Sequence, residues 1–303
     1  MSDAPLIVRP EVADALSSGT PVVALESTII SHGLPREEAL DAARGFESLV
    51  RGHGAVPATV AVLDGHMRVG LDDDSLARLV EEDLPKLSTR DLPIVLARAG
   101  SGSTTVASTS FIADLAGVRV FATGGLGGVH RGAAQTWDES ADLKTLSGVP
   151  ITVVSAGVKS ILDIPATLER FESFGIPVIG YGTAEFPGFW LSSSGHRLDW
   201  SVPDATAVAA VMESREQLEM CEGIVVANPL PVDQQLDPDL HDRALAEALR
   251  RAEEKQVEGK DVTPFLLASI VELTEGKSLE VNIRIVENNI RVAADIAVAW
   301  ARQ

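Results

Sequence analysis

Short apolar runs alternate with amphipathic segments along nearly the whole chain. The apolar runs have the length of strands and the amphipathic segments have helical periodicity. The expected strands lie at 21–25, 118–123, 149–158, 177–181 and 223–229, and the expected helices at 11–18, 34–51, 73–82, 104–116, 160–171, 237–255 and 279–302. Strands that alternate with helices form parallel sheets covered on both faces. The pattern therefore predicts an α/β fold with three layers, α/β/α, around a mixed, largely parallel sheet.

One pair of runs predicts an antiparallel element at an edge of this sheet. Asp64 and Gly65 separate the apolar runs 58–63 and 66–70, and Asp-Gly favours a two-residue hairpin turn. The run 92–97 contains Pro93 and is compatible with a helix start or a strand. No linker-like or repeated stretch divides the sequence, so we expect a single domain over residues 1–303.

Composition narrows the choice of partners. Of the 303 residues, 45% are hydrophobic, and the formal net charge is −19. Such an acidic chain is poorly suited to bind nucleic acid or anionic membranes, which clustered cations recognise. No apolar run is long enough to span a bilayer. With nucleic acid and membranes disfavoured, we expect a small molecule as the partner. The single cysteine, Cys221, and an N-terminus without the pattern of a signal peptide predict a reducing, cytoplasmic location.

Lys159 is the residue with the most evident chemistry. It follows the apolar run 149–158 and precedes the helical segment 160–171. Such strand-to-helix junctions hold the ligand sites of α/β proteins. Desolvation by apolar surroundings would lower a lysine's pKa and free its amine to attack a carbonyl carbon. A surface lysine in an ordinary loop is the alternative.

Two further segments carry candidate site residues. Glu26 comes directly after the strand 21–25, where a carboxylate is costly unless it is paired or functional. A hydrogen-bonded structural glutamate explains the position equally well. The loop 124–132 is rich in glycine and contains His130 and Arg131. Its backbone amides could approach an anion, but it matches neither a dinucleotide-binding fingerprint nor a P-loop.

Carboxylates and amides supply the remaining candidates. Asp138, Glu139 and Asp142 lie within five residues, and hard divalent cations bind such groups. Acids at a helix start, which complement the helix dipole, are the reading that the run favours when taken alone. Asn282 and Asn289 share one helix face, where an amide could meet a sugar hydroxyl or make an interhelical hydrogen bond.

Taken together, ordered motifs over nearly the full length resemble the pseudouridine-5′-phosphate glycosidases, also called the indigoidine synthase A-like family. The motifs that carry the resemblance are 24–33, 54–59, 105–109, 121–125, 127–133, 140–143, 155–163, 226–229 and 263–268. Members of this family break or form the C–C bond between uracil C5 and C1′ of ribose 5-phosphate. The resemblance implies an enzyme in which a lysine forms an imine with the ring-opened sugar.

The same resemblance assigns roles to individual positions. Lys159 matches the nucleophile and Glu26 the proton donor. Asp138 matches the ligand of a divalent cation, usually Mn²⁺, which replaces the helix-start reading of the acidic run. The positions that match substrate contacts are Lys86, Val106, His130, Ser140, Ala141, Asp142 and Asn282. The resemblance also implies a homotrimer.

Departures from the family pattern leave the aglycone open. Gly182 stands where the family usually has glutamine, and Trp137 and Glu139 replace the usual phenylalanine and isoleucine. A C-glycosynthase that joins ribose 5-phosphate to another carbon nucleophile is therefore the alternative to uracil chemistry. A non-catalytic phosphosugar-binding protein is the second alternative.

Overall fold

The sheet is mixed and largely parallel, as predicted. The computed structural model describes residues 5–257, 259 and 262–303. The first four residues, on which the expected absence of a signal peptide partly rests, lie outside the described residues. Within this described part of the chain, eleven strands form one sheet. Its main path runs β1 (Leu6–Val8), β4 (His66–Val69), β3 (Val56–Leu63), β2 (Val22–Leu25), β7 (Val120–Ala122), β8 (Thr152–Ser155), β11 (Ile224–Ala227), β9 (Val178–Tyr181) and β10 (Ser201–Val202).

Antiparallel pairing is confined, within the described strands, to the two partners of β3. One is β4, across the predicted turn, where Asp64 and Gly65 both have positive φ as a primed hairpin turn requires. The other is β6 (Gly102–Thr104), which also pairs in parallel with β5 (Lys86–Leu87). The hairpin is confirmed, but β1 pairs with β4 and forms the edge itself. Three residues before Pro10 are too short a run to reveal that strand from periodicity.

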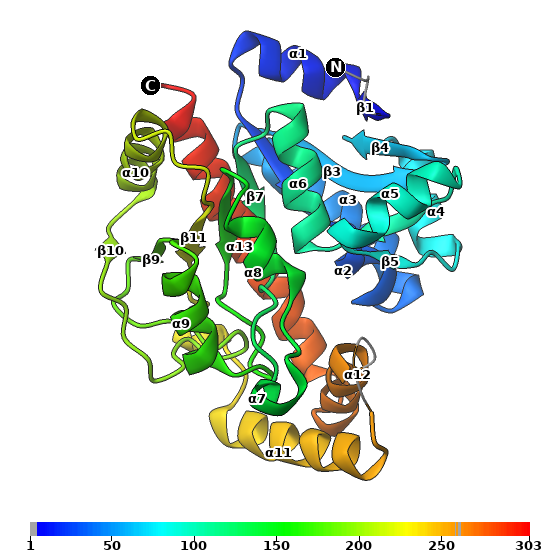
Figure 1. Cartoon of the computed structure of the whole chain (residues 1–303), viewed down its shortest axis with the longest axis vertical. Coiled ribbons are helices and arrows are strands. Elements are labelled where there is room, and N and C mark those ends of the chain that lie inside the picture. The colour runs from blue at the N-terminus through cyan, green and yellow to red at the C-terminus, as the bar shows by residue number, and fades with distance from the viewer. Residues whose placement is uncertain (1–4, 258, 260–261) are drawn as a thin grey trace.

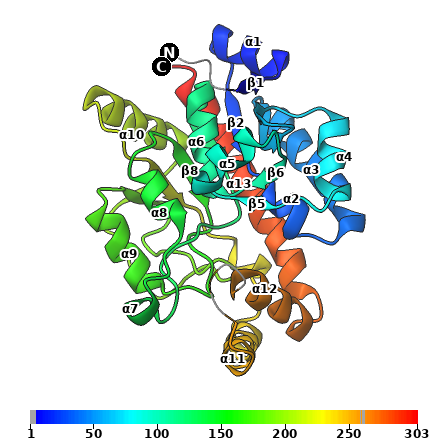
Figure 2. The ribbon, with the colours of Figure 1, turned by 45° about the vertical axis from the view of Figure 1, so that its right-hand side comes forward.

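Helices cover both faces of the sheet, which confirms the three layers (Figure 1, Figure 2). Neighbouring residues of each central strand enter separate cores. Val22 and Ala24 pack with one cluster, and Val23 and Leu25 with the other. The first cluster includes residues of α1 (Pro10–Ser18), α6 (Val106–Ala116), α8 (Ala141–Leu146) and α9 (Ile164–Ser173). The second includes residues of α3 (Arg36–Gly52), α4 (Asp73–Glu81), α10 (Ala205–Gln217) and α13 (Lys277–Trp300).

The ambiguous run 92–97 is the helix α5 (Leu92–Ala97), which follows the 3₁₀ turn η1 (Thr89–Asp91). Pro93 stands in its first turn, where a missing N–H costs little. The other elements are α2 (Thr28–His32), α7 (Ala133–Thr136), η2 (Val232–Gln234), α11 (Pro238–Glu254) and α12 (Val262–Leu273). The last two pack together at the end of the molecule opposite the chain termini (Figure 1).

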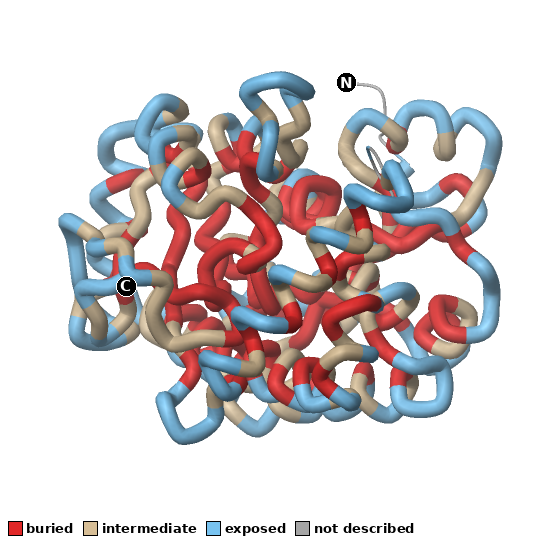
Figure 3. The backbone as a smooth tube through the Cα atoms, turned by 90° about the horizontal axis from the view of Figure 1, so that it is seen from below, coloured by how far each residue is buried: buried red, intermediate tan, exposed pale blue. Residues whose placement is uncertain are grey.

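The carboxyl ends of several parallel strands lie at the same edge of the sheet. These strands are β2, β7, β8 and β11. Buried backbone runs through the middle of the molecule, and exposed segments surround it (Figure 3). The single domain over 1–303 stays a prediction, with which the continuous sheet agrees. Over the described residues, no helix is long and apolar enough to cross a membrane.

Candidate active site

Lys159 lies in the loop between β8 and α9, at the carboxyl edge of the sheet. The helix expected from residue 160 begins at Ile164, with Asp163 accepting the Ala166 N–H as its cap. The Lys159 side chain is partly buried, and its Nζ donates to the Gly125 carbonyl oxygen at 3.1 Å. Its backbone N–H donates to Leu126 O at 3.1 Å. Lys159 is therefore fixed to the glycine-rich loop and is not a freely mobile surface lysine.

Glu26 lies next to this lysine, at the end of β2. Its side chain is enclosed by protein atoms but keeps some accessible surface. Burial raises the pKa of Glu26, while the charge of Lys159 and a hydrogen bond from the Thr123 hydroxyl act in the opposite direction. A carboxyl whose pKa is raised keeps its proton to a higher pH than an ordinary glutamate and is suited to give that proton to a substrate.

Lys86 supplies a second cation to the same cluster. It belongs to β5, whose register places it beside Ser103 of β6, just before α6 begins. Burial, followed by the positive charge of Lys159, lowers the pKa of Lys86, and Glu26 and Asp142 oppose the shift. The residue keeps an exposed surface in the single chain, so water moderates the size of this effect. Glu26, Lys86 and Lys159 thus influence one another electrostatically, while their roles in catalysis and binding stay predictions.

The start of α6 and the start of α8 meet through Asp142. One of its carboxylate oxygens accepts the Ala107 N–H at 2.9 Å, and the other accepts the Gly127 N–H at 2.7 Å. Ser140 caps α8 by accepting the Asp142 N–H at 3.2 Å. Both carboxylate oxygens are therefore bound to backbone amides. Asp142 fixes the glycine-rich loop to α6, and its predicted substrate contact stays a prediction.

Replacing this carboxylate tests its structural role. Asp142 is 6% exposed, so Asp142→Ala leaves two backbone amides without their charged acceptor inside the protein. We expect a loss of about 2–5 kcal/mol in the free energy of unfolding, because each orphaned group costs roughly 1–3 kcal/mol. Urea denaturation checks this value. Asp74→Ala, at an exposed position in the first turn of α4, is the control, and an equal loss in both variants would contradict the assignment.

Val106 and Ala141 offer their backbones to the site. Val106 is the first residue of α6 and its side chain is 3% exposed. Ala141 is the first residue of α8. Neither N–H has an acceptor among the described residues, since both are at helix starts. These two amides face outward from helix N-termini, an arrangement that favours an anion.

His130 of the glycine-rich loop lies close to Asp138, which follows α7. His130 Nδ1 lies 3.8 Å from an Asp138 carboxylate oxygen, and the His130 N–H donates to the Asp138 carbonyl oxygen at 3.0 Å. Burial lowers the pKa of His130, Asp138 opposes this, and Lys159 and Lys86 add to it. Glu139 is engaged elsewhere, where its carboxylate accepts three hydrogen bonds of 2.8–3.0 Å from the Arg170 guanidinium.

The two asparagines on α13 have different surroundings. Asn289 is fully buried, donates to Thr123 O at 2.7 Å and accepts from the Asn228 side chain at 2.9 Å. Asn282 has a buried Oδ1 without a hydrogen-bond partner, and this atom lies 3.4 Å from where a Cβ on Gly124 would stand. Asn289 therefore links α13 to the segments that follow β7 and β11 and makes no bond to another helix through these contacts, whereas Asn282 lies at the glycine-rich loop and its Oδ1 retains capacity for a ligand.

Sequence reasoning missed Thr123 as a site residue. Its hydroxyl donates to Glu26, and it is 2% exposed. The available signal was a polar residue directly after the apolar run of β7, the same position that Glu26 has after β2. Gly125 was also missed, because its carbonyl and its close approach to the Phe189 ring, 2.6 Å from a built Cβ, depend on tertiary structure.

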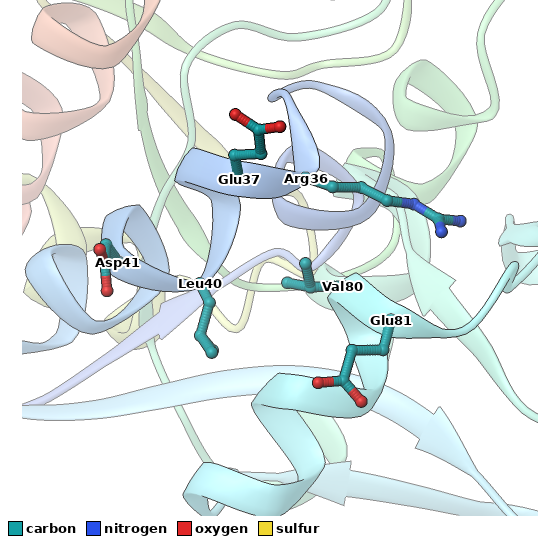
Figure 4. A pocket seen from close by; sticks show the side chains of 6 residues that line it. All are labelled: Arg36, Glu37, Leu40, Asp41, Val80 and Glu81. Atoms are coloured by element: carbon teal, nitrogen blue, oxygen red, sulfur yellow. The ribbon is translucent and has the colours of Figure 1, made fainter.

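One cavity lies beside Glu26, and a larger depression lies elsewhere on the protein. A cavity of about 10 Å³, enough for one water molecule, is lined by Glu26, Thr123 and Gly124 together with Leu25, Ile29, Phe46, Ala122 and Val286. Its largely apolar wall explains why burial dominates at Glu26. A larger depression of about 460 Å³ lies between α3 and α4 and contains none of the predicted site residues (Figure 4).

Gly182 occupies an exposed turn with φ of +64° and no atom within 4 Å of a built Cβ.

Comparison with known proteins shows the family of the chain. The family model described as "Indigoidine synthase A like protein" matches residues 11–299. The chain belongs to the indigoidine synthase A-like family. Curated relatives named pseudouridine-5′-phosphate glycosidase include one from Frankia alni, 58% identical over 98% of this chain and 82% of its own length. Another, from Salinispora tropica, is 59% identical over 96% of this chain and 90% of its own length.

Solved structures show the same family fold. The prealnumycin C-glycosynthase AlnA, in complex with ribulose 5-phosphate, superposes with a TM-score of 0.92 at 34% identity, covering 100% of this chain and 98% of its own. An indigoidine synthase A-like protein from Thermotoga maritima gives a TM-score of 0.90 at 36% identity, covering 99% of this chain and 97% of its own. The α/β fold predicted from the sequence is confirmed.

Proposed function

We propose that this protein reversibly cleaves the C–C glycosidic bond of pseudouridine 5′-phosphate through an imine on Lys159. The observation that carries the proposal is the convergence of Lys159, Glu26 and Lys86 at the carboxyl edge of the sheet. The names of relatives that are 58% and 59% identical support the substrate. The product pair is uracil and ribose 5-phosphate.

Glu26, Lys159 and Lys86 each have a role in the proposed reaction. Protonated Glu26 donates to the ribose ring oxygen, the C1′–O bond breaks, and the Lys159 amine bonds C1′. The lone pair of the Lys159 nitrogen then forms the C1′=N double bond of the imine as the C1′–C5 bond breaks, and the electron pair of that bond stays on C5 of the base, which gains a proton. Water then hydrolyses the imine, which releases ribose 5-phosphate and the free amine. Lys86 keeps positive charge next to the anionic sugar throughout.

The phosphate is expected at the start of α6. The N–H groups of Val106 and Ala141 have no protein acceptor in the described chain, and Asp142 holds the two helix starts together. Lys86 is beside them because Thr105 donates to Leu87 O at 3.1 Å. Amides at a helix N-terminus plus a lysine form a suitable phosphate site. Asn282 and His130 remain for hydroxyl and base groups.

Direct assay tests the proposal. Incubation with pseudouridine 5′-phosphate and Mn²⁺ should release uracil, measured by chromatography, whereas pseudouridine without the phosphate should react at least about tenfold more slowly because it loses the charged contacts. Absence of uracil release would refute the uracil chemistry. The structural likeness to AlnA favours one alternative, a C-glycosynthase, which would consume ribose 5-phosphate only with a different carbon acceptor.

We also propose a Mn²⁺ ion at Asp138. Among the described residues no group of three or more His, Cys, Asp or Glu side chains could hold a metal, so Asp138 would hold the ion together with water and substrate oxygens. This donor set fits Mn²⁺, which accepts carboxylate and water ligands. When bound, the ion would supply positive charge near the substrate phosphate.

Asp138→Asn is expected to weaken Mn²⁺ binding by at least about tenfold, because the ion loses its one carboxylate. Electron paramagnetic resonance of free Mn²⁺ in a titration measures this without relying on activity. Glu139→Gln is the control, since Glu139 is paired with Arg170. Equal Mn²⁺ affinity of Asp138→Asn and the parent protein would refute the site.

The family resemblance further leads us to propose a cytoplasmic homotrimer. Sedimentation velocity should give three times the mass of one chain, and a mass of one chain would refute the trimer. Cell fractionation should place the protein with cytoplasmic markers, and recovery in another fraction would refute that location.

A further inference from the structure

The loop that carries Lys159 is held from two sides. Arg131 donates to the carbonyl oxygens of Ser160 and Ile161, each at 3.2 Å. On the other side, the Ser160 hydroxyl lies 2.9 Å from Nε2 of His241, a residue of α11. Ser160 directly follows Lys159 in the chain. A contact from the distant helix α11 thus ends one residue from the proposed nucleophile.

The His241 ring is itself fixed. It is 5% exposed, and its Nδ1 lies 2.9 Å from a carboxylate oxygen of Asp242. When Nδ1–H donates to this carboxylate, Nε2 of the neutral ring accepts the Ser160 O–H. The ring also meets Trp190 edge-on at 6.1 Å between centroids, and Trp190 Nε1 donates to Ser278 O at 3.0 Å.

Carboxylate, imidazole and hydroxyl in this order suggest a nucleophilic serine, but the burial of Ser160 excludes that role. Ser160 is 4% exposed, and its hydroxyl is directed to His241 inside the protein. The neighbouring Lys159 keeps an accessible side-chain surface and is the reactive group that a substrate can reach. Holding a nucleophile in place is worth much in rate, because a misplacement of about 1 Å can cost roughly 100-fold.

We propose that His241 and Ser160 are a positioning pair for Lys159. Their hydrogen bond fixes the backbone of residues 159–161 against the glycine-rich loop, so that the Lys159 amine meets C1′ of the sugar in attacking geometry. The kinetic part of this inference rests on the proposed function. The bond also links α11, at the far end of the molecule, to the reaction centre (Figure 2).

Kinetics on pseudouridine 5′-phosphate test the pair through Ser160→Ala, His241→Leu and His241→Gln. The first two remove the bond and should lower kcat by about 10- to 100-fold, with KM changed less than about threefold. Glutamine can place an amide oxygen near the Nε2 position, so His241→Gln should keep kcat within about threefold of the parent protein. Equal kcat in Ser160→Ala, His241→Leu and the parent would overturn the proposal.

A second readout does not need the enzymatic activity. Brief acetylation followed by peptide mass spectrometry measures how fast Lys159 reacts, with exposed Lys144 as an internal reference. Without the positioning bond the amine leaves Gly125 O more often, so its acetylation should accelerate at least about threefold in Ser160→Ala and His241→Leu, and return in His241→Gln. Unchanged labelling in the first two variants would also overturn the proposal.

Matched controls separate positioning from a general loss of structure. His53 makes a comparable contact, Nδ1 to Asp295 at 3.2 Å, but at the end of α3 away from the site. His53→Leu should leave kcat and Lys159 labelling unchanged. Should His241→Leu fail to fold by circular dichroism, Ser160→Ala, which removes one oxygen, carries the test alone. Uracil chemistry that fails while Lys159 labelling responds as expected would refute the substrate and retain the pair.

Discussion

Lys159→Ala is expected to slow uracil release from pseudouridine 5′-phosphate by about 10⁴-fold or more. The variant lacks the amine that bonds C1′, and loss of a covalent nucleophile commonly costs this much. Lys159→Arg should be equally inactive, because a guanidinium stays protonated and has no lone pair to give. Its charge and its donor to Gly125 O would persist, so inactivity of both variants identifies nucleophilicity as the lost property.

Borohydride trapping locates the bond on the same residue. Reduction in the presence of ribose 5-phosphate should add one sugar phosphate to Lys159 in the parent protein and none in Lys159→Arg. Lys144→Ala, at an exposed position of α8, is the control and should label like the parent. Turnover of Lys159→Ala at the parent rate would refute the imine. A protein that binds the sugar without catalysis would give no adduct.

Periodicity predicted most of the fold because the parallel strands are buried on both sides. β2 and β11 consist of four buried residues each, and such runs are visible in a sequence. The strands β5 and β10 have two residues each, and no pattern of that length can be recognised. Their pairing depends on neighbours distant in the chain, as for Lys86 beside Ser103.

The candidate site was predictable in part for the same reason. Glu26 and Lys159 follow apolar runs, and the topology of parallel strands brings such positions together. The contacts of Asp142 and Asn289 could not be predicted, because each depends on which backbone groups packing leaves without partners. Gly182 is the opposite case. The sequence marks it as a departure from the family pattern, but in the structure it lies in an open turn without a neighbouring side chain.

Glu26→Gln is expected to lower kcat by about 10²–10⁴-fold while raising the melting temperature at neutral and alkaline pH. The loss of rate follows from removing the proton donor. The gain in stability follows from burial, which raises the pKa of Glu26 above its ordinary value of 4.5. A carboxyl with a raised folded-state pKa favours folding below its unfolded pKa, and this contribution is lost as the pH rises through the folded value. Glutamine stays neutral and avoids that loss.

Scanning calorimetry from pH 4 to pH 9 measures the difference between Glu26→Gln and the parent protein, which should be smallest at pH 4 and grow until Glu26 is fully ionised. Glu47→Gln is the matched control. Burial also raises the pKa of Glu47, and its carboxylate accepts from Thr59 at 2.6 Å, on α3 and away from the proposed site. Both variants should gain stability as the pH rises, but only Glu26→Gln should lose activity. A melting temperature of Glu26→Gln below that of the parent at pH 9 would show that pairing with Lys159 and Lys86 outweighs burial, and activity retained in this variant would remove Glu26 as the donor.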